Sequence, residues 1–213
     1  MNIYLPMKTD LLDKGEGTIW TGGGLKEPEI VEFEKVKCAK FDGNSRLRLY
    51  DTTLIKSLNE WTVQVWVYCT KKASSGSSRI FANYCLGNSV SNSTFEVTIV
   101  SNTKFNSFGV IYDTSINLIG NGWHYIKITS DGQKIYTYLD KQKLGENSTI
   151  TKRFNVNSCT IGDENGDYAG YNVRFYGYMT QFKFSDKYND NDLPLHNSKF
   201  IYINKNNEIW AMV

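Results

Sequence analysis

Three glutamates near the N-terminus come closest to a catalytic pair in this chain. Glu27, Glu29 and Glu32 lie within a span of six residues. Retaining glycoside hydrolysis needs two carboxyl groups about 5–5.5 Å apart, one as the acid and one as the nucleophile. Pro28 lies inside the span, and proline removes a backbone donor, so the span fits poorly into a central β-strand. We therefore interpret it as an acidic loop and expect no catalytic residue in the chain.

A second set of candidates is aromatic. Tyr136 and Tyr138 alternate along one segment, and Arg174, Tyr176 and Tyr178 alternate along another. Tyrosine offers a sugar ring an apolar face and a hydroxyl, and arginine adds directed donors. We predict that all five lie on the outer face of one sheet and form a ligand-binding surface. The alternative is that these rings pack under loops or against another subunit.

One acidic turn is a candidate cation site. Residues 163–167 read Asp-Glu-Asn-Gly-Asp, which places carboxylates around a turn-forming glycine. Calcium needs six to eight oxygen ligands from a shaped loop, and this stretch lacks the twelve-residue pattern with its terminal glutamate. We interpret it as a solvated acidic turn and expect no metal and no other cofactor.

The cysteines and histidines do not suggest a zinc site. No Cys-x-x-Cys spacing occurs, and neither histidine is near a cysteine in the sequence; the cysteines are Cys38, Cys69, Cys85 and Cys159. We expect free thiols that act as small apolar side chains. His124 falls in an apolar strand pattern, which predicts a buried, hydrogen-bonded histidine.

The segments that carry these residues show the period-two alternation of β-strands. The predicted strands include 63–67, 95–99, 108–111, 124–129, 135–139 and 173–179, separated by turns such as Asn121-Gly122 and Asp131-Gly132. The nearest approach to a helix is residues 51–59. The pattern predicts an all-β, two-sheet antiparallel jelly-roll sandwich with minimal helix.

The predicted organisation is one sandwich with an N-terminal extension. Residues 1–35 are expected to form a lead-in strand near Ile3 and a long loop that pack on or extend the sandwich. Residues 36–213 are expected to form the sandwich itself, ending in a hairpin that pairs 200–203 with 209–212. A chain of 213 residues with 40% hydrophobic content is large enough for one buried core.

Charge and hydropathy argue against nucleic acids and membranes as partners. A net charge of +2 without a lysine or arginine cluster gives no nucleic-acid footprint. No apolar run approaches the roughly 20 residues of a membrane span. The N-terminus lacks the basic and apolar segments of a signal peptide, and we expect the chain to be a complete gene product.

Three motifs together resemble a known superfamily. They are Phe41-Asp42-Gly43, the segment 61–67 with Trp66-Val67 at its end, and Trp123-His124 followed by Tyr138-Leu139-Asp140. Their order and spacing are similar to those of the laminin-G-like, concanavalin A-like lectin/glucanase superfamily, over about residues 36–185. The resemblance implies a concanavalin A-like sandwich with Trp66 and Trp123 in its interior.

The resemblance also implies where family chemistry is missing. Glycan hydrolases of the superfamily carry Glu-x-Asp-x-x-Glu on a central strand, and the nearest match here is the span from Glu27 to Glu32, which has glutamate in the middle position. Members often bind calcium through the aspartate of Gly-x-Ile-Asp-Glu-Val. Thr180 and Gln181 stand where that Asp-Glu pair would be, so structural calcium is not supported at the family position.

From these observations we expect a non-enzymatic binding or structural protein. The preferred interpretation is a bacteriophage virion component, in a fibre, tail or capsid surface, that attaches to other virion proteins or to host glycans. Its expected location is the virion, and a homo-oligomer is left open. The alternatives are a bacterial carbohydrate-binding or adhesion module and, third, a glycan hydrolase. Fold-level resemblance does not fix function.

Overall fold

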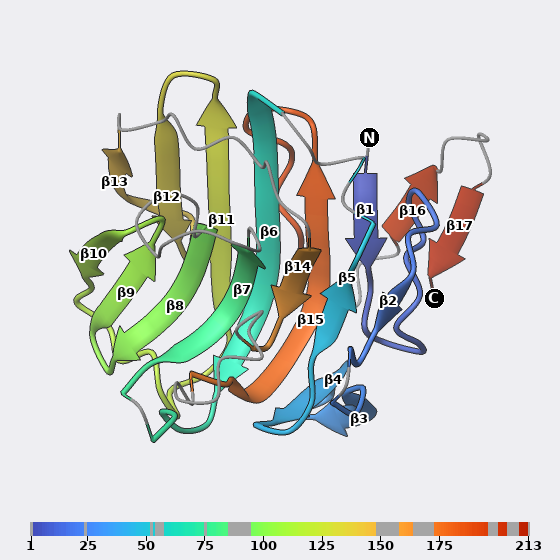
Figure 1. Ribbon diagram of the computed structural model, residues 1–213, viewed down its shortest axis with the longest axis horizontal. Helices are drawn as coiled ribbons and strands as arrows, with labels where there is room; N and C mark the ends of the chain where they lie inside the picture. The colour runs from blue at the N-terminus through green and yellow to red at the C-terminus, as the bar shows by residue number, and fades with distance from the viewer. Residues whose placement is uncertain are drawn as a thin grey trace.

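The computed structural model describes residues 2–23, 25–51, 53, 58–74, 76–84, 95–147, 158–163, 173–195, 200–203 and 209–212. These residues form two large antiparallel sheets, which lie one over the other in Figure 1, and a two-stranded hairpin. They contain no helix, and therefore none that is long and apolar enough to cross a membrane. The all-β antiparallel sandwich expected from the sequence is confirmed.

The eight-stranded sheet contains the longest strands. Its order is β13 (Gln142–Asn147), β12 (Ile135–Leu139), β11 (His124–Asp131), β6 (Glu60–Cys69), β15 (Tyr176–Ser185), β4 (Val36–Asp42) and β3 (Glu29–Phe33). The eighth strand, β1 (Asn2–Leu5), also pairs with β15. The sheet therefore has β15 as a junction that contacts β6, β4 and β1.

The seven-stranded sheet covers the other side of the core. Its order is β10 (Val110–Asp113), β9 (Lys104–Ser107), β8 (Phe95–Ser101), β7 (Ser78–Tyr84), β14 (Ser158–Ile161), β5 (Leu47–Leu49) and β2 (Trp20–Thr21). The hairpin pairs β16 (Phe200–Ile203) with β17 (Ile209–Met212). The N-terminal segment contributes β1 and β3 to one sheet and β2 to the other.

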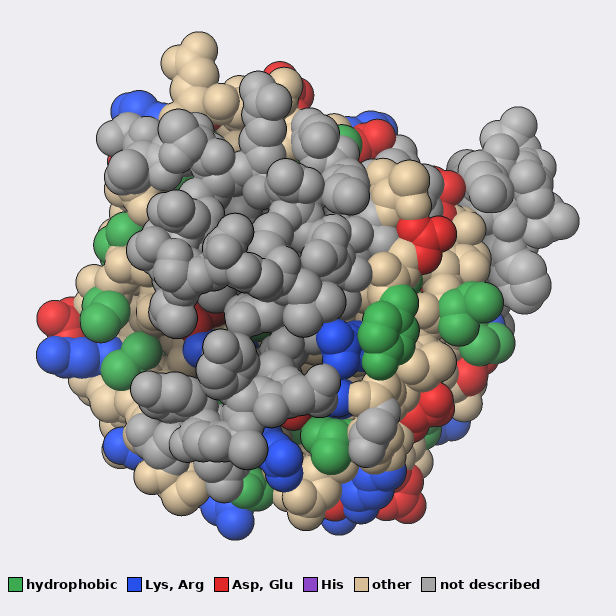
Figure 2. Space-filling model, in the orientation of Figure 1, with side chains coloured by type: hydrophobic (Ala, Val, Ile, Leu, Met, Phe, Trp, Pro, Cys, Tyr) green, Lys and Arg blue, Asp and Glu red, His purple; other side chains and the backbone are tan. Residues whose placement is uncertain are grey.

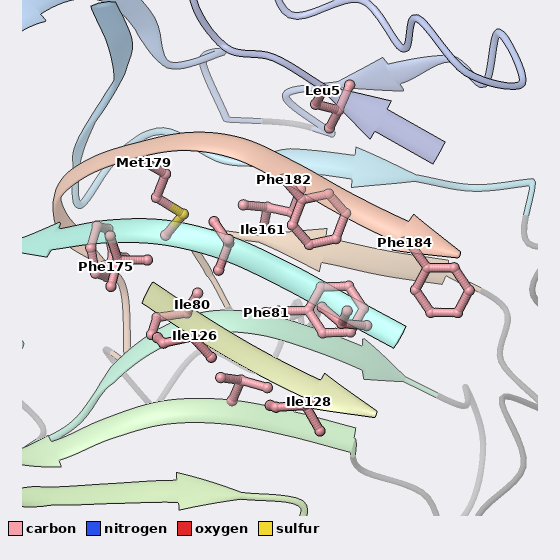
Figure 3. Close-up of a cluster of buried hydrophobic side chains, with 14 of the residues drawn as sticks. Leu5, Ile80, Phe81, Ile126, Ile128, Ile161, Phe175, Met179, Phe182 and Phe184 are labelled. Carbon is pink, nitrogen blue, oxygen red and sulfur yellow. The ribbon is translucent and has the colours of Figure 1, made fainter. Parts of the chain in front are cut away.

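The core lies between the two sheets. Figure 3 shows side chains from both sheets pointing toward one another, among them Ile126 and Ile128 of β11, Ile80 and Phe81 of β7, and Phe182 and Phe184 of β15. Removing such apolar area from water is the main driving force for folding.

Alternation along β6 assigns the two faces of the eight-stranded sheet. Val63, Val65 and Val67 belong to the buried core. Gln64 and Trp66 alternate with them and point to the outer face of the same sheet. Both faces of β6 carry large side chains, and only one of these faces is the sandwich interior.

Several sequence-based expectations need correction. Trp66 and Trp123 are half-buried and lie outside the core, because both belong to the outer face of the eight-stranded sheet. Phe108 is not in a strand: with φ of 55° it forms a turn with Gly109 (φ 82°), a pairing of positive φ values that suits a tight hairpin between β9 and β10. The glutamate span contains edge strand β3 instead of a loop.

The described surface in the view of Figure 1 mixes both signs of charge. Figure 2 shows Lys and Arg groups interleaved with Asp and Glu groups, and the hydrophobic groups stand apart from one another. Residues 51–59, the nearest approach to a helix in the sequence, lie mostly outside the described residues.

The core assignment predicts a clear difference between two tryptophans of β6. Trp61 is 1% exposed and stacks against Phe108 and Phe184, with ring centroids 5.3 and 6.5 Å away. Trp61→Ala should lower the free energy of unfolding by about 3–5 kcal/mol, the usual cost of truncating a buried aromatic. Trp66→Ala should cost less, because Trp66 is half-buried. Urea unfolding measures both, and equal losses would contradict the assignment.

Candidate functional site

A short segment crosses the outer face of the eight-stranded sheet. Residues 186–195, called the strap below, leave the end of β15 and run over β6 and β11. Thr62 Oγ1 donates to the Lys187 carbonyl, and the Asn189 amide donates to Thr129 Oγ1 over 2.7 Å. The strap then returns toward β15, because Gln181 Nε2 donates to the carbonyls of Pro194 and Leu195.

Two ion pairs fix the middle of the strap. Lys183 Nζ lies 2.6 Å from Asp190 Oδ2, and Lys127 Nζ lies 2.9 Å from Asp192 Oδ1. Burial by itself raises the pKa of Asp190, but the hydrogen bond and charge of Lys183 outweigh it, so the pKa lies below its ordinary value. The Asp190 carboxylate is therefore held in its charged form against the sheet.

The strap also contacts two aromatic residues of the sheet. Trp66 Nε1 donates to the Leu193 carbonyl over 2.8 Å, and the Leu193 amide donates to the Tyr125 hydroxyl over 3.1 Å. Burial raises the pKa of Tyr125 well above its usual range, so this hydroxyl keeps its proton and also donates to Gln64 Oε1. The ring centroids of Trp66 and Tyr125 are 5.0 Å apart.

The family calcium position is occupied by neutral groups with local partners. Thr180 Oγ1 donates to the carbonyls of Pro6 and Lys37, and the Gln181 amide donates to Pro6. Gln181 adopts φ of 56° at a β-bulge in β15. Within the described residues no group of three His, Cys, Asp or Glu side chains is placed to hold a metal ion.

Beyond the strap, four aromatic rings cluster on the same outer face. We call Phe33, Tyr68, Trp123 and Tyr178 the aromatic platform. Phe33 stacks on Tyr178 with centroids 3.9 Å apart and planes 11° apart, and it meets the edge of Tyr68 at 4.8 Å. Trp123 meets Tyr68 edge-on at 6.0 Å. All four rings are half-buried, so each keeps part of its surface in contact with solvent.

The platform contains a polar group without a visible partner. Trp123 Nε1 is buried, and in the described part of the chain nothing accepts its hydrogen. A buried indole N–H normally finds an acceptor. A ligand oxygen would satisfy this donor.

The five residues predicted as one site are separated in the structure. Register through β11 and β6 places Tyr136, Tyr138 and Tyr178 on the same outer face, as predicted. The strap divides that face, however, because Tyr188 of the strap lies 5.8 Å from the Tyr136 ring. Tyr136 also donates to Asp131 Oδ2 over 2.8 Å. Only Tyr178 of the five belongs to the aromatic platform.

Arg174 and Tyr176 support the Phe41-Asp42-Gly43 turn. Arg174 Nη1 donates to the Gly43 carbonyl over 2.9 Å. A Cβ added to Gly43 would lie 2.3 Å from the Tyr176 ring, and Gly43 has φ of 81°, so the turn requires glycine there. Lys71 Nζ lies 4.3 Å from the centroid of the same ring. These residues border the platform next to Tyr178 and are engaged in local packing.

The other candidates for chemistry have structural partners. His124 is 5% exposed and its Nδ1 lies 2.8 Å from Asp140 Oδ2, which confirms the buried, hydrogen-bonded histidine. Cys38, Cys69 and Cys159 are free and buried, and burial raises the pKa of the Cys69 thiol to about 11, so it is not a ready nucleophile. Cys85 lies outside the described residues.

The acidic candidates are not brought together. Glu29 and Glu32 are exposed on edge strand β3, and their separation of three residues puts them on opposite faces. Asp163 lies 3.5 Å from Arg46 Nη1 and 3.8 Å from Arg174 Nε, so two arginines compensate its charge. The rest of the predicted acidic turn, residues 164–167, lies outside the described residues.

Sequence reasoning missed three of the four platform residues as surface groups. Trp123 is expected in the interior from the family resemblance, Tyr68 falls just after the predicted strand 63–67, and Phe33 lies directly after the acidic span. Strict alternation in β6 gave one usable signal, because Tyr68 shares a face with Gln64, and glutamine on a strand points to a polar environment.

The family model for the concanavalin A-like lectin/glucanases superfamily matches residues 41–189. No curated protein matches the sequence. Among solved structures, domain 4 of AbnA, a GH43 extracellular arabinanase from Geobacillus stearothermophilus in complex with arabinotriose, is similar with a TM-score of 0.58 and 15% identity over 85% of this chain and 90% of that one.

Two larger proteins contain a similar domain. The botulinum neurotoxin type G receptor binding domain matches with a TM-score of 0.61 and 14% identity, over 88% of this chain and 48% of that one. A Trypanosoma rangeli sialidase matches with a TM-score of 0.64 and 11% identity, over 88% of this chain and 30% of that one. The present chain therefore spans about half of the toxin domain and under a third of the sialidase. At these identities the likeness concerns the fold alone.

The attachment of the strap gives a testable prediction. Gln181→Met keeps the side-chain length but removes the donor to Pro194 and Leu195, leaving carbonyls in a partly buried place without their partner. The free energy of unfolding should fall by about 1–3 kcal/mol, and the NMR signal of the Trp66 indole N–H should shift. Gln133→Met, at an exposed turn, is the control and should change neither. Unchanged stability and an unshifted indole signal in Gln181→Met would contradict the assigned role.

Proposed function

The chain belongs to the concanavalin A-like lectin/glucanases superfamily, and from that premise we propose that it is a non-enzymatic carbohydrate-binding module whose glycan stacks on the aromatic platform. The observation that carries this proposal is the cluster of Phe33, Tyr68, Trp123 and Tyr178 on one sheet face. Half-buried rings held by their neighbours lose little side-chain entropy when a sugar ring packs on them.

The chemistry of the platform suits a sugar. The C–H faces of a pyranose or furanose pack on aromatic rings, and its hydroxyls need donors and acceptors nearby. Tyr68 and Tyr178 bring hydroxyl groups, and Trp123 brings the buried indole N–H that has no acceptor within the described residues. Lys71 and Arg174 lie at the Tyr176 end and are engaged with the Tyr176 ring and the Gly43 carbonyl.

Two further observations support a binding role over hydrolysis. The nearest match to the family's catalytic motif, Glu27 to Glu32, lies on and just before edge strand β3, where Glu29 and Glu32 are on opposite faces, whereas retaining hydrolysis uses a close pair. Among the similar structures, the domain of the arabinanase is bound to arabinotriose, and the toxin domain is named for receptor binding.

We further propose that the module works in a bacteriophage virion, with a bacterial adhesion protein as the alternative. In a bacteriophage virion, the module would attach to host glycans or to neighbouring virion proteins through the same platform. In a bacterial adhesion protein, it would bind a surface polysaccharide. Genes for capsid, portal or tail proteins beside this gene would favour the virion.

A matched pair of double variants tests the platform. Tyr68→Ala with Tyr178→Ala removes two platform rings, and Tyr136→Ala with Tyr138→Ala removes two tyrosines from the same sheet face across the strap. Glycan-array screening of the parent, with arabinotriose included, selects the ligand, and calorimetry then measures its affinity. The platform variant should bind about tenfold more weakly or worse, a loss of about 1.4 kcal/mol, because two large apolar contact surfaces for the sugar are removed.

The control variant should bind as the parent does, and thermal melting checks that both variants are folded. Equal losses in the two variants, or parent-like binding by the platform variant, would show that the platform is not the site. If the parent protein binds no glycan on the array, the proposed carbohydrate-binding function is wrong. Reducing-end release on the selected glycan tests the non-enzymatic part, and turnover by the parent would contradict it.

A further inference from the structure

Much of the sheet surface beneath the strap is polar although it is buried, and two aromatic residues, Trp66 and Tyr125, lie under its Leu193 end. Thr62, Gln64 and Thr129 are 0% exposed, and Lys127 is 7% exposed. Burying polar groups costs free energy unless each is hydrogen-bonded, and a buried ion pair is commonly no more stabilising than apolar packing. A surface covered only for stability would be expected to carry apolar side chains. These residue types are instead those that recognise a polar ligand.

The strap is attached to this surface mainly through polar contacts. Of its residues, Leu193 is the one that is fully buried and apolar, while Lys187, Tyr188, Asn189, Asn191 and Asp192 are exposed. The remaining attachment consists of hydrogen bonds, the two ion pairs and the contact between the Tyr188 and Tyr136 rings, whose centroids are 5.8 Å apart. Such contacts are exchangeable, because another polar chain can offer the same groups.

The charges beneath the strap define what that other chain must carry. Lys127 pairs in register with Gln64, and Gln64 pairs with Lys183, so the two lysines lie in one row across β11, β6 and β15. Two strand spacings separate them by about 10 Å. Each ammonium group is paired with a strap carboxylate, Asp192 or Asp190. A replacement must therefore bring two anionic groups at a similar separation.

One donor in this row lacks an acceptor. Gln64 Nε2 is buried and has no hydrogen-bond partner within the described residues, while its Oε1 accepts from Tyr125. It lies between the two lysines. The strap therefore satisfies the charges of this row but leaves a central donor unused.

We propose that this row is a binding site for a linear acidic polysaccharide with carboxylates on alternate sugars, and that the strap occupies it as an internal mimic until the polysaccharide displaces it. The site is continuous with the aromatic platform, because Trp66 under the strap and Tyr68 of the platform share one face of β6. The inference rests on the proposed function in taking a sugar chain as the ligand. The ligand is in addition anionic, and the strap controls its access to the row of lysines.

The test compares three probes and two variants. Hyaluronan octasaccharide carries a carboxylate on every second sugar, chitohexaose is a neutral chain, and an octaglutamate peptide carries charge without sugars. Asp190→Asn with Asp192→Asn releases the strap from both lysines. Asp113→Asn is the control, because its carboxylate is 78% exposed on β10 of the other sheet. Calorimetry measures the affinity of each probe for the parent and both variants.

The released variant should bind hyaluronan octasaccharide at least about tenfold more tightly than the parent, and the gain should vanish in 0.5 M salt through screening. Affinity for chitohexaose and octaglutamate should not rise, and Asp113→Asn should behave as the parent. Unchanged or weaker hyaluronan binding, or an equal gain for the neutral chain or the peptide, would overturn the proposal.

Amide hydrogen exchange of the parent protein tests the proposal even if the released variant does not fold. Saturating hyaluronan octasaccharide should increase exchange at the Asn189 and Leu193 amides, which donate to Thr129 and Tyr125. Unchanged protection at both amides would also overturn the proposal. This readout reports the strap itself, so its failure is distinct from failure of the aromatic platform, which is measured with the Tyr68 and Tyr178 double variant.

Discussion

A single β-bulge in β15 determines how the eight-stranded sheet is assembled. Met179 points into the core and Thr180 to the outer face, and strict alternation would then turn Phe182 outward. Gln181, with φ of 56°, inserts one residue, so that Phe182 and Phe184 return to the core while Lys183 faces outward. The same bulge separates the part of β15 that pairs with β4 from the part that pairs with β1. It therefore gives β15 a different neighbour on each side of the irregularity and places Lys183 under the strap.

The bulge also joins three segments that are distant in the sequence. The backbone and side chain of Gln181 contact Pro6 after β1 and Pro194 and Leu195 in the strap, and Thr180 reaches Lys37 of β4. The family resemblance implies an anionic Asp-Glu pair at this position in many members. Here a neutral pair makes direct hydrogen bonds to backbone carbonyls. These hydrogen bonds connect the segment after β1, strand β4 and the strap to β15.

The sequence predicts the sheets well because the alternation of side chains is a local property of each strand. It predicts the site poorly because the site is formed by residues that are far apart in the sequence. Val63, Val65 and Val67 identify β6 and its core face from their spacing alone. Trp66 and Trp123 were misplaced because an aromatic residue fits the interior and the outer face equally well by pattern. The strap has no period and no apolar run, so no local signal shows that it crosses the sheet. Phe33 reaches Tyr178 only through the pairing of β3, β4 and β15, which is set by tertiary structure.

Strand β6 links the two surfaces on which the proposals rest. Its outer face carries Gln64 and Trp66 under the strap, and then Tyr68 in the platform. Trp66 is held by the Leu193 carbonyl and by the Tyr125 ring, so release of the strap frees the indole beside the platform. A sugar chain that begins on the platform would meet this indole next. Because a ligand shifts an equilibrium only through its different affinity for the two states, a chain long enough to reach the lysines would open the strap, whereas a short one bound on the platform would leave it closed.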